Sequence, residues 1–514
     1  MDFPRSAGVL LHPTSLPSDY CIGELGSEAF NFIDYLINAG ISLWQILPLG
    51  PTGYGNSPYA ALSAFAGNPF LISLEKLDAD GYLNKEDLAT YPGPDTDSSK
   101  VDYNLVTSWK VPLLEKAAHN FLNTATKSEK NDFTKFCNDN SEWLNDFTLF
   151  VVIKEHYDKK AEKENAADSR WNYYWDKKII LKQKQAESKW SIIYKDQIEI
   201  KKVLQYFFFS QWNSLKKYAN SKGISIIGDI PIYVAACSSD LWSHKKMFHL
   251  DKNGHQTVVA GVPPDYFSAT GQLWGNPIYN WKEHEADNFS WWISRIQGML
   301  KMVDIVRIDH FIGLEAYWEV PAGAPTAETG KWVKAPGRKM FETLKEKLGD
   351  LPIIAEDLGV LTEDVEALRD DFGFPGMKIL QFAFTFNEDG SQDTKNMFLP
   401  FGYSPNTVVY TGTHDNDTTR GWYNSISNRE KDLVRRYLGR PDNDIVWDLI
   451  REALSSVSNY AIIPMQDILN LDTESRMNTP STLKNSNWSW RMSKNSMADY
   501  TANRLKGLIE LYGR

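Results

Sequence analysis

Acidic residues stand at the ends of several apolar segments in this sequence. Asp229, Asp309, Glu356 and Asp415 each follow or end a run of mostly apolar residues. A carboxylate buried beside such a run costs free energy unless it is hydrogen-bonded, paired or functional. A single residue of this kind is most often structural, but four of them on separate segments indicate a common site.

Arg307 and Asp309 are separated by one residue. On a β-strand, side chains two positions apart point to the same face. The guanidinium would then keep the neighbouring carboxylate charged, as a nucleophilic carboxylate must be. We therefore predict that Asp309 is a nucleophile.

Glu356 lies in a more apolar segment, between Ile354 and Leu358. Burial and neighbouring carboxylates both raise the pKa of a carboxyl group, which suits an acid that donates a proton near neutral pH. An ionised carboxylate and a protonated one, facing a scissile bond, form the pair used by retaining glycosidases. Asp415, beside His414, adds a third acid and a donor suited to binding and straining a sugar ring.

These residues need a scaffold that brings segment ends together, and eight apolar, β-branched runs could supply it. Such runs are typical of strands covered on both faces of a parallel sheet. Helical patterns separate them, as in Ala29–Ala39, Val203–Ser221 and the segment that Thr362 can cap. Strands alternating with helices predict a (β/α)8 barrel, with its chemistry at the C-terminal ends of the strands. The predicted strands are Ala7–Leu11, Ser42–Leu49, Ile224–Ile232, Val303–Phe311, Pro352–Leu358, Met377–Phe384, Thr407–Thr413 and Tyr460–Met465.

Two segments are longer than a barrel repeat needs. We predict one catalytic domain over residues 1–514, with a mostly helical insertion at 52–202, between the second and third strands. A second insertion at 234–292, between the third and fourth strands, is rich in Gly, Pro and aromatic residues and is predicted to be loop-rich.

Composition restricts the partners of the protein. A net charge of −11 over 514 residues disfavours nucleic acid, whose binding depends on Lys and Arg, whereas a neutral sugar is indifferent to charge. The 18 Trp residues can stack on sugar rings, although most of them are expected to fill the core. Three widely spaced cysteines fit a reducing compartment, and the N-terminal apolar run is too short for a signal peptide. With no segment long enough to span a membrane, we expect a cytoplasmic protein.

Nine motifs together resemble the amylomaltase family of 4-α-glucanotransferases, glycoside hydrolase family 77, in the α-amylase clan. They occur in order from the first predicted strand to the C-terminal region. The motifs are Gly8–Pro17, Leu47–Tyr59, Gly228–Val234, Gly261–Ser268, Gly271–Pro277, Arg307–Phe311, Ala355–Gly359, Gly412–Thr418 and Arg476–Pro480.

The resemblance implies a role for each matching residue. Asp309 matches the family nucleophile, Glu356 the general acid/base and Asp415 the transition-state stabiliser. The remaining matches are to substrate-binding positions: Tyr54, Ser57, Tyr59, Asp229, Tyr266, Phe267, Trp274, Arg307, His310, His414 and Asn478. The resemblance also implies maltooligosaccharides and α-1,4-glucans as donors and acceptors, transfer to a 4-hydroxyl group, and no cofactor.

Three other functions would share part of this residue pattern. A net α-glucan hydrolase of the same clan would use the same three carboxylates and let water accept the sugar. A metal-dependent barrel enzyme would need clustered His ligands, but His12 stands alone, so no metal is predicted. A non-catalytic glycan-binding protein would keep the aromatic residues but would not need a nucleophile and an acid.

Overall fold

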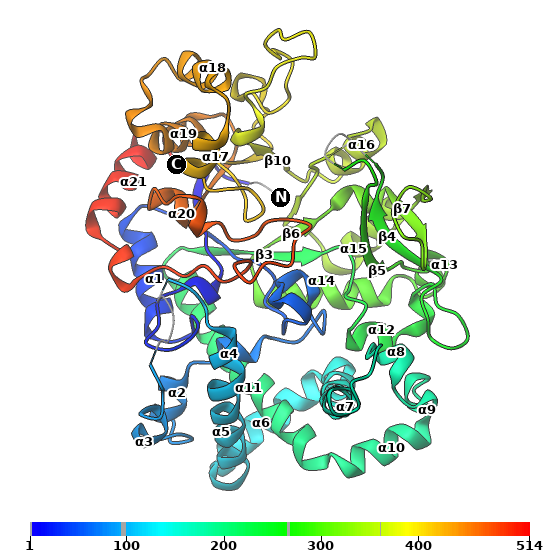
Figure 1. The fold of residues 1–514 in the computed structure, drawn as a ribbon. Coiled ribbons are helices and arrows are strands. Elements are labelled where there is room, and N and C mark those ends of the chain that lie inside the picture. The colour runs from blue at the N-terminus through cyan, green and yellow to red at the C-terminus, as the bar shows by residue number, and fades with distance from the viewer. Residues whose placement is uncertain (1–2, 94–98, 265–267, 360) are drawn as a thin grey trace.

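The fold is built around an eight-stranded parallel sheet (Figure 1). The computed structural model describes residues 3–93, 99–264, 268–359 and 361–514. Each predicted strand has a counterpart, and every ladder in this sheet is parallel. In spatial order the strands are β10 (Gly376–Ile379), β11 (Thr407–Tyr410), β12 (Tyr460–Pro464), β1 (Ser6–Leu10), β2 (Leu43–Gln45), β3 (Ser225–Pro231), β6 (Ile305–Asp309) and β9 (Ile353–Ala355).

The two end strands of this order also meet. The N–H of Ala355, on β9, donates a hydrogen bond to the carbonyl of Pro375, just before β10, at 3.0 Å. The sheet therefore curves round into a nearly closed barrel, and the predicted (β/α)8 fold is confirmed. Most strands are shorter than their apolar runs. Past the strand ends, residues such as Leu47 leave the ladder but remain buried at the barrel mouth.

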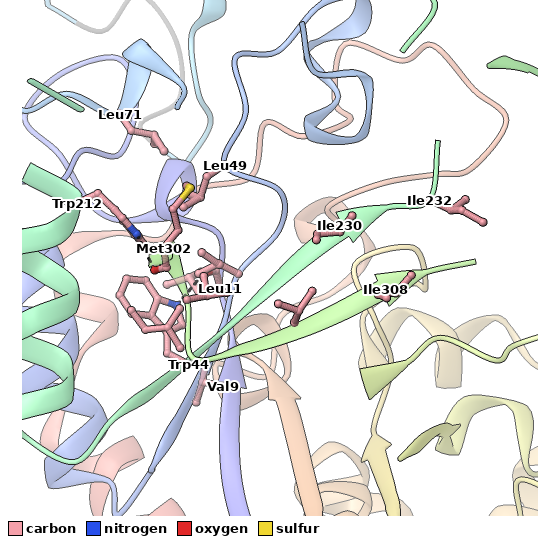
Figure 2. Packing of buried hydrophobic residues seen from close by; sticks show 14 of the residues in the cluster. Val9, Leu11, Trp44, Leu49, Leu71, Trp212, Ile230, Ile232, Met302 and Ile308 are labelled. Atoms are coloured by element: carbon pink, nitrogen blue, oxygen red, sulfur yellow. Dashed lines mark hydrogen bonds between the residues drawn. The ribbon is translucent and has the colours of Figure 1, made fainter. Parts of the chain in front are cut away.

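Side chains on the strands divide between two hydrophobic layers, because successive residues point to opposite faces. Leu10 belongs to the cluster inside the barrel. Val9 and Leu11 belong to the larger cluster between the barrel and its helices. Figure 2 shows this outer layer, where the indole of Trp44 donates to the Leu11 carbonyl at 2.8 Å and that of Trp212 to the Met302 carbonyl at 2.9 Å. These two hydrogen bonds satisfy the polar edges of two large, fully buried rings.

Helices cover the outside of the barrel, and local sequence sets their ends. The side chain of Thr362 caps α16 by accepting from the N–H of Val365, as predicted. Helix α11 ends just before Gly223, whose φ of +81° favours glycine. The helices around the barrel are α1 (Ser27–Asn38), α11 (Lys195–Ser221), α14 (Ser290–Met302), α15 (Gly337–Leu348), α16 (Glu363–Asp371), α17 (Thr419–Ser425), α18 (Asn428–Leu438), α19 (Ile445–Ser455), α20 (Met465–Ile468) and α21 (Asp499–Leu511).

The segment between β2 and β3 is mostly helical. Its longer helices gather at one side of the molecule, away from α18 and α19 (Figure 1). A π-helical turn, Val106–Lys110, leads into α5. The helices here that precede α11 are α2 (Leu74–Ala79), α3 (Lys85–Leu88), α4 (Tyr103–Leu105), α5 (Val111–Thr124), α6 (Lys127–Asp139), α7 (Ser141–Glu164), α8 (Trp171–Tyr174), α9 (Lys177–Ile180) and α10 (Lys184–Ile193).

A second, four-stranded antiparallel sheet was not predicted from the sequence. Strands β4 (Val258–Val262) and β5 (Gln272–Pro277) lie within residues 234–292, the segment predicted to be loop-rich, together with the short helices α12 (Ser239–Ser243) and α13 (Trp281–Ala286). They join β7 (Ala316–Pro321) and β8 (Lys331–Lys334), which follow the fourth barrel strand. The Gly and Pro residues of this segment break the alternation that would have revealed its strands.

A buried ion pair ties the helical segment to the loop after β1. The ammonium group of Lys110 lies 2.5 Å from Glu24 Oε1 and donates to the Phe70 carbonyl at 2.7 Å. The side chain of Lys110 is fully excluded from solvent, and the second oxygen of Glu24 accepts from the N–H of Leu74 at 3.2 Å. Neither charge has water as an alternative partner, so each depends on the other.

Removing one member of this pair should destabilise the fold. We expect Lys110→Met to lower the free energy of unfolding by about 3–5 kcal/mol, because Glu24 would be left as an unpaired buried charge. The Lys110→Met/Glu24→Gln double variant should recover part of the loss. Urea denaturation followed by circular dichroism measures both. Lys135→Met, which breaks a solvent-exposed pair with Asp139, is the matched control and should have little effect. Equal losses for Lys110→Met and Lys135→Met would contradict the account.

Candidate active site

Three charged side chains meet where β3 and β6 end. Asp229 on β3 is the register partner of Arg307 on β6, so their side chains lie on the same face. Arg307 Nη1 lies 2.6 Å from Asp229 Oδ2, and Nη2 lies 3.1 Å from Asp309 Oδ1. Burial alone would lower the pKa of Arg307, but the carboxylates of Asp229 and Asp309 raise it well above its ordinary value. Arg307 is therefore a fixed positive charge that neutralises and orients two acids.

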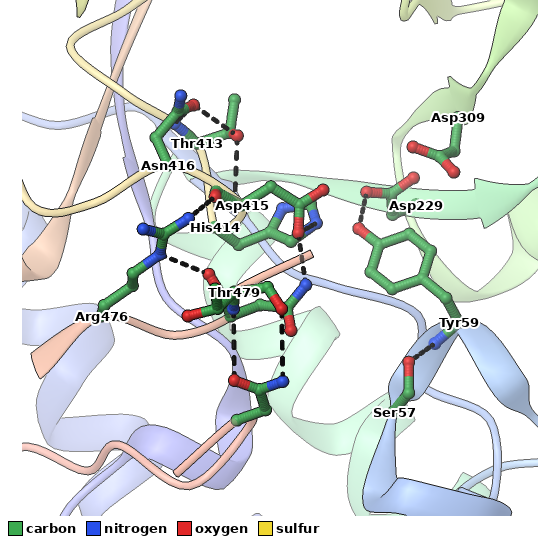
Figure 3. A network of polar contacts seen from close by, with 12 residues as sticks. Ser57, Tyr59, Asp229, Asp309, Thr413, His414, Asp415, Asn416, Arg476 and Thr479 are labelled. Atoms are coloured by element: carbon green, nitrogen blue, oxygen red, sulfur yellow. Dashed lines mark hydrogen bonds and ion pairs between the residues drawn. The ribbon is translucent and has the colours of Figure 1, made fainter. Parts of the chain in front are cut away.

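Asp229 is held beneath the opening of the barrel. Its Oδ2 also accepts a hydrogen bond from the hydroxyl of Tyr59 at 2.8 Å, and Figure 3 shows its carboxylate beside that of Asp309. Burial raises the pKa of Asp229 to about 6, against the opposing effect of Arg307. Its second oxygen, Oδ1, is buried and has no hydrogen-bond partner within the described part of the chain. That oxygen can accept a hydrogen bond from a hydroxyl group of a ligand.

Glu356 follows β9 directly and occupies a much drier position than Asp309. It is 8% exposed, whereas the side chain of Asp309 is 31% exposed. Its carboxylate accepts from the N–H groups of His310, at 2.6 Å, and Leu358, at 3.1 Å. Burial, and next the charge of Asp309, raise the pKa of Glu356 to about 8, against the opposing effects of Arg307 and the His310 N–H. Glu356 is therefore protonated at neutral pH.

The backbone of His310 is strained in a way that serves this arrangement. Its φ of +53° is left-handed, a conformation that costs free energy for a residue other than glycine. This turn after β6 directs the His310 N–H toward Glu356. Burial lowers the pKa of the His310 imidazole to about 4, so the ring is neutral. The indole of Trp274 meets it edge-on, with 4.7 Å between ring centroids.

Asp415 lies across the site from Asp229 and Asp309, after β11 (Figure 3). Its Oδ1 accepts from the side-chain amide of Asn478 at 2.6 Å, and the His414 Nε2 lies 3.5 Å away. Arg476 donates to the carbonyls of Asp415 and Asn478, both at 2.6 Å. This network fixes a carboxylate whose side chain is 47% exposed and therefore open to a ligand.

A cavity of about 880 Å³ opens over these residues. Seven of the predicted site residues line it: Ser57, Tyr59, Trp274, Asp309, His414, Asp415 and Asn478. Asp229, Arg307 and Glu356 lie beneath it as the buried support described above. Tyr54 is 83% exposed and does not belong to the lining. The predicted positions Tyr266 and Phe267 lie outside the described residues.

The structure adds residues that the sequence analysis did not single out. Trp488 lines the cavity, and its ring lies 5.8 Å from that of Tyr59 and 5.9 Å from that of His414. Arg476 holds the backbone beneath Asp415. Both lie in or next to motifs of the C-terminal region. Trp488 is buried and packs with the cluster inside the barrel, so the polar run Ser486–Ser489 around it gave no signal of a site residue.

The chemistry of the site follows from these contrasts. One side of the cavity carries an ion-paired carboxylate, Asp309, and the buried carboxyl group of Glu356 lies beneath it on the neighbouring strand segment. The other side carries Asp415, and aromatic rings border the space between them. Such an arrangement is suited to a neutral, hydroxyl-rich ligand, with one group that can donate a proton and another that can act as a nucleophile. Among the described residues there is no group of three or more His, Cys, Asp or Glu side chains placed to hold a metal ion.

Comparison with known proteins gives consistent results. A family model described as 4-alpha-glucanotransferase matches residues 11–497. The 4-alpha-glucanotransferase of Synechocystis sp. is 49% identical over 514 residues, covering 99% of this chain and 98% of that protein. The 4-alpha-glucanotransferase of Thermus thermophilus is 45% identical, covering 99% of both chains. The solved structure of amylomaltase from Streptococcus agalactiae in complex with acarbose superposes with a TM-score of 0.93 at 41% identity, covering 99% of both chains.

The raised pKa of Glu356 predicts a pH-dependent effect of Glu356→Gln on stability. In the folded protein this carboxyl group ionises at about pH 8, whereas in the unfolded chain it ionises near 4.5. Raising the pH through this window therefore favours the unfolded state of the parent protein, and Gln cannot ionise. We expect the unfolding free energy of Glu356→Gln, relative to the parent, to rise between about pH 4.5 and 8 and then level off.

Urea denaturation at a series of pH values measures this difference. Glu366→Gln, an exposed position on α16, is the matched control. A difference between Glu356→Gln and the parent that does not change with pH would contradict the protonated state of Glu356.

Proposed function

Because this chain belongs to the 4-alpha-glucanotransferase family, we propose that Asp309 is the nucleophile, Glu356 the acid/base and Asp415 the transition-state stabiliser of its reaction. The enzyme transfers segments of α-1,4-glucan from a donor to the 4-hydroxyl group of an acceptor, through a covalent glycosyl-enzyme intermediate. The observation that carries the assignment is the contrast at the ends of β6 and β9. Asp309 is paired with Arg307, whereas Glu356 is buried and its pKa is raised to about 8.

The first half of the reaction cleaves the donor. Glu356 gives its proton to the glycosidic oxygen as the bond from that oxygen to the anomeric carbon breaks. An Asp309 oxygen forms a bond to the same carbon. The ion pair with Arg307 supports this step because it orients the Asp309 carboxylate at the cavity wall. The leaving part of the donor departs with a new 4-hydroxyl group.

The second half restores the enzyme. Glu356, now ionised, removes the proton from the 4-hydroxyl group of an acceptor, whose oxygen attacks the anomeric carbon and releases Asp309. Asp415, held by the amide of Asn478, binds the hydroxyl groups of the sugar that passes through the charged transition state. Two displacements at one carbon retain the α configuration.

The surrounding residues bind the sugar on either side of the cleaved bond. We assign Asp229, Arg307, His310 and His414 to the glucose unit that is transferred, because they surround Asp309 and Asp415. Ser57, Tyr59 and Asn478 contact neighbouring units, and the 37%-exposed indole of Trp274 stacks on the acceptor side. From the family resemblance, Tyr266 and Phe267 cover the acceptor side as well, and Tyr54 binds glucan away from the cleaved bond.

Maltooligosaccharides and longer α-1,4-glucans are the proposed donors and acceptors. The three cysteines of the chain are free thiols, which supports the proposal that the enzyme acts in the reducing cytoplasm. None of the helices in the described ranges has the length and apolar character needed to cross a bilayer.

Replacement of Asp309 tests the nucleophile. Asp309→Asn should fold normally and lose nearly all turnover of maltotriose, because an amide cannot form the covalent intermediate. A 5-fluoro glucosyl fluoride donor, whose intermediate breaks down slowly, should label the parent protein at Asp309, as seen by mass spectrometry of its peptides. Labelling at another carboxylate would overturn the assignment.

Counting reducing ends distinguishes transfer from hydrolysis. With maltotriose as the sole substrate, transfer produces glucose and longer oligosaccharides while the number of reducing ends stays constant. Hydrolysis adds one reducing end for each bond that is cleaved. We expect a constant number for the parent, and a rise that tracks bond cleavage would make the enzyme a hydrolase.

A Trp274→Ala variant sharpens this test. Loss of the indole beside His310 should weaken acceptor binding and admit water, so that the number of reducing ends per cleaved bond increases. Trp332→Ala is the matched control, because Trp332 is 49% exposed on β8 of the same antiparallel sheet and does not line the cavity.

A further inference from the structure

The contact between β9 and β10, here called the seam, differs from the contacts between the other neighbouring strands of the barrel, and it lies beside Glu356. Parallel ladders join all other neighbouring strands, but within the described residues no ladder links β9 to β10. Two hydrogen bonds span this seam. The Ala355 N–H donates to the Pro375 carbonyl at 3.0 Å, and the Met377 N–H donates to Asp357 Oδ1 at 2.8 Å. Ala355 and Asp357 are the two chain neighbours of Glu356.

The side chain of Asp357 therefore accepts a hydrogen bond from β10 that a backbone carbonyl would accept between other neighbouring strands of the barrel. It is 3% exposed, and because it follows Glu356 in an extended segment, it points to the opposite face. There its Oδ2 lies 2.6 Å from Nη1 of Arg369, on α16. The space is closely fitted, since a Cβ atom added to Gly376 would lie 2.3 Å from the same oxygen. The ion pair fixes the carboxylate that receives the Met377 N–H.

Apart from the N–H of Leu358 in its own segment, the hydrogen bonds of Glu356 in the described structure run to β6 and the turn that follows it. Its N–H donates to the Ile308 carbonyl, its carbonyl accepts from the N–H of Phe311, and its carboxylate accepts from the N–H of His310. Toward β10, its position depends on the bonds of its two neighbours. The seam also reaches the nucleophile side, because the sulfur of Met377 lies 3.4 Å from Nε of Arg307.

We propose that Asp357, held by Arg369, is a positioning residue that fixes Glu356 for proton transfer by closing the barrel between β9 and β10. The proposal rests on the assignment of Glu356 as the acid/base. Loosening the seam should displace the carboxyl group of Glu356 while Asp309 remains anchored on β6 by Arg307. Turnover of the natural donor, which needs a proton on its leaving oxygen, should then fall more than turnover of a donor whose leaving group needs no proton.

Two donors separate these effects in the full-length enzyme. Maltotriose needs protonation, whereas α-maltotriosyl fluoride loses fluoride without an acid, so fluoride release in the first turnover reports attack by Asp309 alone. For Asp357→Ala we expect turnover of maltotriose to fall about 10- to 100-fold, with fluoride release changed by less than about threefold, since displacements near 1 Å can cost two orders of magnitude. Asp357→Asn, which keeps an oxygen for the Met377 N–H, should lose less.

Two reference variants define the scale of the effect. Glu356→Ala should show the same preference for the fluoride in a more severe form. Asp370→Asn is the matched control, because Asp370 pairs with Nε of the same arginine at 2.7 Å but is exposed and does not reach the seam. It should match the parent with both donors. If Asp357→Ala does not fold, Arg369→Met breaks the same ion pair with Asp357 by changing its more exposed member.

The outcomes test the positioning role of Asp357 separately from the acid/base role of Glu356. Equal losses with both donors for Asp357→Ala or Arg369→Met, or no loss with either donor, would overturn the positioning role. If Glu356→Ala itself shows no preference for the fluoride, the acid/base assignment fails instead. A preference in both Glu356→Ala and the seam variants supports the proposal.

Discussion

The guanidinium of Arg307 lies between two carboxylates, 2.6 Å from Asp229 and 3.1 Å from Asp309, with only 5% of its side chain exposed. A cation this deeply buried is tolerated because both acids compensate it, and the buried carboxylate of Asp229 is tolerated because of the cation. The interaction orients Asp309 at the end of β6 and Asp229 at the end of β3. It also requires β3 and β6 to be neighbours in a fixed register, which the parallel barrel provides.

The same arrangement explains why two nearby acids behave differently. Asp309 contacts Arg307 and is partly open to the cavity, whereas Glu356, on the next strand, makes no ion pair in the described structure and receives only N–H donors. Burial and the charge of Asp309 then raise the pKa of Glu356 to about 8. Two carboxyl groups on neighbouring strands therefore differ in environment: Asp309 is ion-paired and partly exposed, whereas Glu356 is buried and has a raised pKa. The left-handed backbone of His310, which costs free energy in a residue other than glycine, accompanies the hydrogen bond from its N–H to Glu356.

Much of this could be predicted from the sequence because the signals are local. The barrel strands are continuous apolar runs, and Arg307 and Asp309 are close enough in the chain for strand geometry to place them together. Contacts between distant segments left no such signal. Examples are the hydrogen bonds from Tyr59 to Asp229, from Asn478 to Asp415, and from the N–H of Met377 to Asp357. The antiparallel sheet of β4, β5, β7 and β8 was missed because glycine and proline interrupt its strands, and because β7 and β8 follow another barrel strand.

The proposed retaining mechanism requires a protonated Glu356 and an ionised Asp309 at the same bond at neutral pH. Neutron diffraction from a deuterium-exchanged crystal near pH 7 would locate the acidic proton directly. We expect a deuteron on the carboxyl group of Glu356, none on Asp309, and a fully deuterated guanidinium on Arg307. A deuteron on Asp309, or its absence from Glu356, would contradict the account.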